Sequence, residues 1–125
     1  MNRLFLLIGI CLLFSCSKKG VVPPSPNIVV NTPIENQHYV KGDTIRITGT
    51  VTHLSEILEV AVHMTNTSNN IEFFHNHFST GNLMLYSFNS VYGIADNSKA
   101  TYKVEVEAND IDGNTSTKAL TITIN

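Results

Sequence analysis

The stretch that decides the fold is Thr44-Ile45-Arg46-Ile47-Thr48-Gly49-Thr50-Val51-Thr52. Apolar or small residues occupy every second position of this stretch, and Thr or Arg occupies the positions between them. A period of two with one apolar face is typical of a β-strand that is buried on one side. The sequence therefore predicts a strand over 44–52 whose buried face carries Ile45, Ile47, Gly49 and Val51.

The same alternation recurs along the rest of the chain. Residues 57–65 predict a strand that buries Leu58, Val60, Val62 and Met64, with Glu59, Ala61 and His63 on its outer face. Residues 102–109 predict another, which buries Tyr102, Val104, Val106 and Ala108. Shorter strands are expected at 28–30 and 119–124.

Residues 81–99 fit this pattern less well, and here we expect a strand over 83–88 followed by a loop over 91–94. Asp110-Ile111-Asp112-Gly113-Asn114 predicts a turn between strands, since no acidic residue closes it as in a calcium loop. About seven short strands in roughly 100 residues are typical of an immunoglobulin-like sandwich. The predicted fold class is all-β, an immunoglobulin-like antiparallel β-sandwich over residues 27–125.

The amino-terminal segment has the features of an export signal. Arg3 precedes an apolar run of 11 residues, Leu4–Phe14, which is shorter than the ~20 residues that a membrane-spanning helix needs. The end of this run, Leu13-Phe14-Ser15-Cys16, resembles the bacterial lipobox. This resemblance implies cleavage before Cys16 and lipidation of its thiol, so we expect residues 1–15 to be a lipoprotein signal peptide.

Residues 16–26 then form a Pro-rich linker between the lipidated cysteine and the domain. Pro23-Pro24-Ser25-Pro26 favours extended polyproline geometry, which makes a semi-rigid spacer. Ser17-Lys18-Lys19 lacks the acidic residues that usually follow the lipidated cysteine of surface-exposed Bacteroidetes lipoproteins. We therefore expect an outer-membrane lipoprotein that faces the periplasm, with exposure at the cell surface as the alternative.

Composition argues against several functions. The net charge is −2 and only 14% of the residues are charged, so a nucleic-acid partner is not expected. The two cysteines, Cys11 and Cys16, belong to the signal and the lipid anchor, which leaves no thiol for a disulfide or a nucleophile. The chain also has no Gly-x-Ser-x-Gly motif, and we do not expect an enzyme.

Histidines suggest a metal site. In a strand, His75 and His77 lie on one face, and a hairpin through residues 66–70 places His63 opposite or diagonal to His75. With a carboxylate such as Glu59, three imidazoles suit Zn²⁺ or Cu²⁺. His53, close to Glu56 in the sequence, is a candidate fourth ligand.

Other interpretations remain open. The histidines are also consistent with scattered surface residues, in which case the domain is a non-enzymatic module that binds a protein or glycan partner through its aromatic segment, 73–92. Asp43-Thr44-Ile45 resembles the O-glycosylation acceptor of Bacteroidetes, which would place a glycan on Thr44.

Several stretches taken together resemble a known family. They are Thr32–Ile34, Tyr39–Ile45, Leu58–His63, Phe74–His77 and Tyr102–Val104, followed by Asp110 and Gly113-Asn114. Their order is similar to the histidine-rich Bacteroidetes lipoproteins catalogued as domain of unknown function 4625. The resemblance extends to His63, His75 and His77, whereas the family's further histidine cluster has no counterpart in residues 82–89. The family name implies no activity.

Overall fold

The computed structural model describes residues 24–95 and 99–125, all outside the expected signal peptide. Cys16 and most of the Pro-rich linker lie outside the described residues. The strands are β1 (Asn27–Thr32), β2 (Gln37–Tyr39), β3 (Thr44–Asn66), β4 (Glu72–Gly93), β5 (Ala100–Asp110) and β6 (Thr115–Ile124). In this part of the chain no helix is long and apolar enough to cross a membrane.

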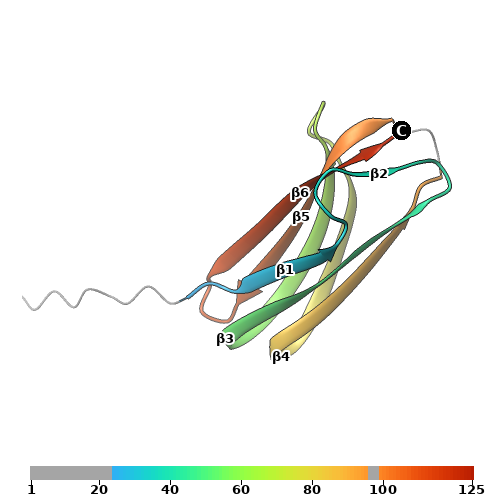
Figure 1. Cartoon of the computed structure of the whole chain (residues 1–125). Coiled ribbons are helices and arrows are strands. Elements are labelled where there is room, and N and C mark those ends of the chain that lie inside the picture. The colour runs from blue at the N-terminus through green and yellow to red at the C-terminus, as the bar shows by residue number, and fades with distance from the viewer. Residues whose placement is uncertain (1–23, 96–98) are drawn as a thin grey trace, which may run out of the picture.

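The long strands β3 and β4 each contribute to both layers of the sandwich (Figure 1). In one layer, the first part of β3 pairs with β1 and with the last part of β4. In the other layer, the last part of β3 pairs with the first part of β4 and with β5. The strand β5 then pairs with β6, which pairs in parallel with β2. The predicted all-β, immunoglobulin-like sandwich is confirmed.

The predicted strands 44–52 and 57–65 are parts of one strand, β3. Its pairing register shifts between Thr52 and Ile57, where the chain bends from one layer into the other without an intervening loop. Residues 24–95 and 99–125 therefore form six strands instead of the expected seven or so. Residues 53–56 have no partner on β4, so the ladder is interrupted at the bend and resumes in the other layer at Ile57.

The core lies between the two layers and is built from the alternating residues. Ile45, Ile47, Gly49 and Val51 are buried as predicted, as are Tyr102, Val104, Val106 and Ala108 of β5. Leu58 and Ala61 are exceptions. Leu58 is exposed and Ile57 is buried in its place, and Ala61, expected on the outer face, is buried. A register shift between Ile57 and Glu59 changes which residues face inward at this point.

Gly49 shows how closely β1 and β4 approach β3. A Cβ atom at this position would overlap the carbonyl oxygen of Val29 and the ring of Phe88. Phe88 is buried, and its ring occupies the space above the glycine. Glycine is therefore required here for close approach, and its φ angle is not the reason.

The stretch 91–94, expected as a loop, begins with strand residues. Val91, Tyr92 and Gly93 pair with Arg46, Ile45 and Thr44 at the end of β4. The sequence pattern is misleading here because the apolar Val91 is exposed, whereas the polar Ser90 before it is buried. Pairing with the strongly patterned start of β3 extends the strand.

Candidate metal centre

The hairpin between β3 and β4 brings His63 and His75 together. The two residues are direct cross-strand partners, as predicted from the hairpin length. Their ring centroids lie 4.4 Å apart in an edge arrangement. His77 lies two residues further along the same face of β4 and stacks on His75, with centroids 4.6 Å apart and an interplanar angle of 16°. The three imidazoles therefore form one cluster, called the histidine cluster below.

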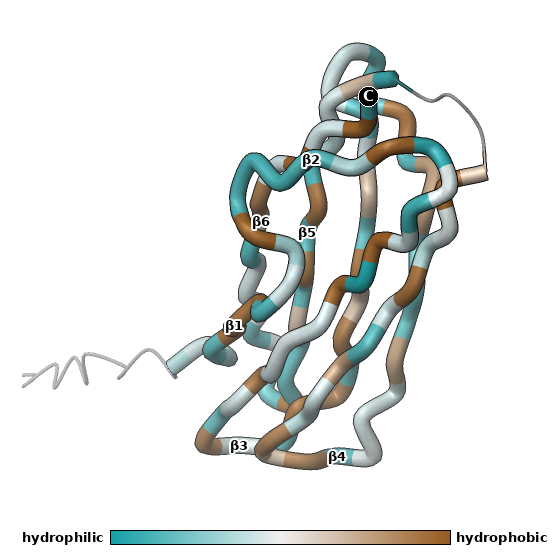
Figure 2. The backbone as a smooth tube through the Cα atoms, turned by 45° about the vertical axis from the view of Figure 1, so that its right-hand side comes forward, coloured by the Kyte–Doolittle hydropathy of each residue, from teal (hydrophilic) through white to brown (hydrophobic). Residues whose placement is uncertain are grey.

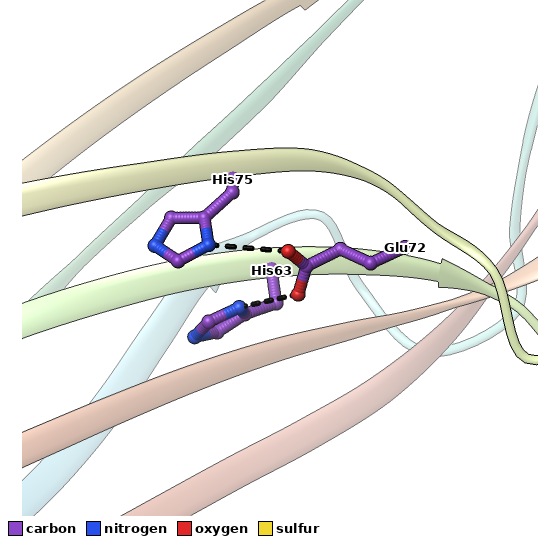
Figure 3. Close-up of side chains that lie close together, drawn as sticks. All are labelled: His63, Glu72 and His75. Atoms are coloured by element: carbon purple, nitrogen blue, oxygen red, sulfur yellow. Dashed lines mark hydrogen bonds and ion pairs between the residues drawn. The ribbon is translucent and has the colours of Figure 1, made fainter.

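A carboxylate that sequence reasoning missed joins two of these rings (Figure 3). Nδ1 of His63 lies 2.7 Å from Oε2 of Glu72, and Nδ1 of His75 lies 3.1 Å from Oε1 of the same side chain. One ligand atom from each of these three residues falls within 4.8 Å of the others. This group therefore has donor types that bind transition metals, close enough together to be a candidate metal site.

The third ring has its own carboxylate. Nδ1 of His77 lies 3.0 Å from Oε1 of Glu59, the acidic residue that the sequence placed beside the cluster. A carboxylate only accepts hydrogen bonds, so Nδ1 of each neutral ring carries the hydrogen. Nε2 then holds the lone pair, and Figure 3 shows this second nitrogen of His63 and of His75 directed away from Glu72. Histidine ligands of metals commonly donate the other N–H to a carboxylate in this way.

The histidine cluster is accessible to ions from solvent and lies beside a negative charge. The side chains of His63, His75 and His77 are 21%, 41% and 51% exposed. The pKa of Glu72 is lowered, chiefly by the hydrogen bond from His63. Burial raises this pKa by less than that bond lowers it, and the hydrogen bond from His75 and the charges of both rings lower it further. Glu72 is therefore ionised at neutral pH and attracts cations to the cluster.

His53, the expected fourth ligand, does not join the cluster. Its Nε2 lies 2.8 Å from Oδ2 of Asp110, and the two side chains are only 3% and 0% exposed. Ten residues of β3 separate it from His63, which corresponds to about 30 Å of extended chain. Its real partner lies 57 residues away in the sequence, so closeness to Glu56 was misleading.

Asp110 closes the turn between β5 and β6, as the turn prediction implied. Its carboxylate accepts hydrogen bonds from the backbone N–H and the side-chain amide of Asn114, both at 2.7 Å. Burial raises the pKa of Asp110, but these two bonds, together with those from His53 and from the backbone N–H of Asp112, outweigh burial and lower it. Hydrogen-bonding groups of the chain itself thus surround this carboxylate.

Glu72 was missed because strict alternation places it on the opposite face from His75. The pairing register shifts between Met64 and Thr65, beside the start of β4, and this irregularity turns Glu72 toward the rings. The only sequence signal was an acidic residue at the end of a hairpin that carries histidines. Such a signal is too weak to interpret without the register.

The remaining candidate residues lie elsewhere. Thr44 is exposed at the start of β3, and the carboxylate of the preceding Asp43 accepts the backbone N–H of Val40 at 2.9 Å. Within the aromatic segment, Phe73 and Phe74 pack edge-on against Tyr92, with centroids 5.2 and 5.4 Å apart. These rings support one another at the end of the sandwich that carries the β3–β4 hairpin.

Comparison with known proteins informs on the fold. No family model and no curated protein matches the sequence. The fibronectin(III)-like modules of Clostridium thermocellum CbhA are similar in structure, with a TM-score of 0.56 and 14% identity over 79% of this chain. This chain covers 46% of that structure, less than half its length.

A second similar structure is a superoxide reductase (neelaredoxin) from Ignicoccus hospitalis, with a TM-score of 0.51 and 8% identity. The alignment covers 82% of this chain and 81% of the reductase. The fold is an immunoglobulin-like β-sandwich. At these identities the likeness is one of fold alone, and the function has to be argued from the site.

Proposed function

We propose that this protein is a lipid-anchored periplasmic domain that binds a divalent transition metal, zinc or copper, through His63, His75 and His77. The observation that carries the proposal is the placement of the three rings, since Nδ1 of each lies within 3.1 Å of a carboxylate oxygen. Nε2 of each ring is then the atom that can ligate.

The donor set favours zinc or copper over calcium or magnesium. Neutral imidazole is a preferred ligand of Zn²⁺ and Cu²⁺, whereas Ca²⁺ and Mg²⁺ prefer oxygen ligands. Glu72 and Glu59 orient the rings from the Nδ1 side, which leaves the Nε2 atoms as the ligands. Three protein ligands leave a coordination position for water or for a donor from another molecule.

The exposure of the cluster favours metal handling over a structural metal. A structural zinc site is usually closed by four protein ligands, whereas two of these rings are more than a third exposed. An open site both takes up and releases its ion readily. Buffering, delivery or sensing of the metal fits this geometry, without catalysis. The lipid anchor rests on the lipobox-like residues 13–16, and the periplasmic location rests on the lack of acidic residues in Ser17-Lys18-Lys19. Membership of the family of domain of unknown function 4625 is part of the same proposal.

Calorimetric titration of residues 24–125 with Zn²⁺ and with Cu²⁺ tests the proposal. We expect one ion per chain at pH 7.5 with micromolar or tighter affinity, and loss of this heat in a His75→Ala/His77→Ala variant. A His38→Ala variant is the matched control, because His38 lies on β2 and contacts Asn125 instead of the cluster. Equal heats in both variants, or no heat with the native domain, would refute metal binding at this cluster.

The second candidate function is an interaction module that binds a protein or glycan without metal. The immunoglobulin-like fold is compatible with this role, and the partly exposed ring of Phe73, which packs against Tyr92, offers a contact for a partner. Absence of metal binding in the titration would leave this candidate.

A further inference from the structure

Large apolar side chains are exposed at the end of the sandwich where β3 and β4 bend. Leu54, in the bend of β3, is 82% exposed. Exposed apolar residues are also found at the bend of β4 and in the turn after β5, and we call the whole set the apolar tip: Leu54, Leu58, Leu83, Met84, Leu85 and Ile111.

Backbone pairing places these residues close together. Leu85 pairs with Thr52 and Leu83 pairs with Ile57, so both flank the bend that carries Leu54. The backbone N–H of Ile111 donates to the carbonyl of Glu56 at 2.9 Å, which brings the turn after β5 beside the same bend. Figure 2 shows hydrophobic residues at the lower bends of β3 and β4. Single exposed apolar residues are ordinary, whereas a group of this kind marks an interaction surface.

The chain enters the domain at this tip. Asn27, at the start of β1, pairs with Thr52, and Pro24 and Ser25 line the same open cleft as Leu54. Only seven residues lie between Cys16 and Pro24, and the eight Cα-to-Cα steps that join the two residues span at most about 29 Å when fully extended. If Cys16 carries lipid, the apolar tip is the part of the domain held closest to the bilayer.

Lysines lie where the chain enters the domain, and the exposed carboxylate of Asp112 lies beside Ile111 in the turn after β5. Lys118 lines a second open cleft together with Pro26 and Asn27, at the entry of the chain. Lys18 and Lys19 follow the expected lipid site in the sequence. Lysine near a membrane surface attracts anionic headgroups, and apolar side chains beside it insert into the headgroup region.

We propose that the apolar tip docks on the lipid bilayer that holds the anchor, with Leu54 inserted among the headgroups. This inference rests on the lipid anchor of the proposed function and is independent of metal binding. Docking directs the β3–β4 hairpin outward, so the histidine cluster faces the aqueous side, about 30 Å away along β3. The open metal site would then be accessible to partners in solution.

The experiment uses tryptophan reporters, because the chain has no native tryptophan. Full-length chain carrying Leu54→Trp is reconstituted in vesicles of phosphatidylcholine and phosphatidylglycerol, with and without brominated acyl chains. Leu54→Trp emission is expected to shift to shorter wavelength and to be quenched by the brominated lipid, since docked side chains reach about 5–10 Å into the headgroup–acyl boundary. Ile71→Trp, exposed in the hairpin at the far end, is the matched control and is expected to show neither effect.

A second variant tests the tip itself. Leu83→Ser/Leu85→Ser in the Leu54→Trp chain is expected to reduce quenching to the level of Ile71→Trp, with an unchanged circular dichroism spectrum because both leucines are exposed. If the protein floats with the vesicles but the Leu54→Trp reporter is no more quenched than Ile71→Trp, docking is refuted. The lipid anchor is then retained, and the tip is left as a surface for another protein. Chain that does not float overturns the anchor and docking together. Zinc titration of the same samples reports separately on the metal proposal.

Discussion

Two parts of strand β3 carry histidine in opposite environments. Near the tip, His53 is buried against Asp110, whose carboxylate also accepts two hydrogen bonds from Asn114. Beyond the bend, His63 is partly exposed beside the more exposed His75 and shares the carboxylate of Glu72 with it. Both sites pair imidazole with carboxylate, so the residue types do not distinguish them.

Solvent access distinguishes the two sites. A buried pair leaves a costly unpaired group when one partner is removed, and so contributes to folding. Exposed pairs of this kind contribute little to stability, because water solvates either partner alone. The buried site is therefore expected to hold the fold together, and the exposed cluster to be free to bind an ion.

The largest expected effect is on stability, at the buried site. His53→Ala should lower the free energy of unfolding by about 2–3 kcal/mol, since it removes a hydrogen bond to a buried charge. Urea unfolding at pH 7.5 measures this loss, and zinc affinity should not change. His38→Ala is the control, expected within about 0.5 kcal/mol of the native chain. A His53→Ala domain as stable as the native one would show that burial does not separate the two sites.

The second largest effect is expected on zinc affinity, when a ligand is removed from the exposed cluster. His63→Ala should weaken zinc binding by about 100-fold, because loss of a direct ligand costs at least as much as loss of a supporting residue. Its free energy of unfolding without metal should stay within about 0.5 kcal/mol of the native value. Calorimetry and urea unfolding of the same preparation measure both quantities. A large stability loss with unchanged zinc affinity would assign the cluster a structural role.

Glu72→Gln sharpens the comparison within the cluster. Glutamine keeps the size of the side chain but removes the charge that orients two rings, so zinc affinity should fall by about 10-fold. Asp112→Asn, a carboxylate exposed in the turn after β5, is the charge-matched control and should leave affinity unchanged. If both variants lose affinity equally, general electrostatics explains the effect and orientation by Glu72 does not.

The smallest effect is expected on the pH dependence of the free energy of unfolding in acid. The pKa of Asp110 is lowered in the folded chain, so its stabilising contribution is complete above the unfolded value of about 3.9 and is lost as pH falls through the lower folded value. Acid titration of unfolding should therefore show stability falling below about pH 4, with a shallower fall in Asp110→Asn. Glu72 has the same sign but is exposed, so Glu72→Gln should change the acid slope less. A native chain whose stability falls mainly between pH 5 and 7 would contradict this assignment.

Sequence reasoning succeeded where neighbours in space are close along the chain. Hairpin length was enough to place His63 opposite His75, and alternation identified the buried residues of β5. It failed at the irregular positions. Register shifts exchanged Ile57 for Leu58 in the core and turned Glu72 toward the rings, and no local pattern reports a shifted register.

By itself, the sequence determined that this chain forms strands, where its hairpin turns and which histidines share a face, because alternation and turn residues act over a few positions. Only the tertiary structure decided that β3 crosses between layers, that His53 is buried against Asp110 and that Glu72 completes the histidine cluster. The physical reason is that burial and register depend on which distant segments pack together. This packing sets how far water reaches an imidazole–carboxylate pair. A buried pair stabilises the fold, and an exposed pair is available to bind a metal.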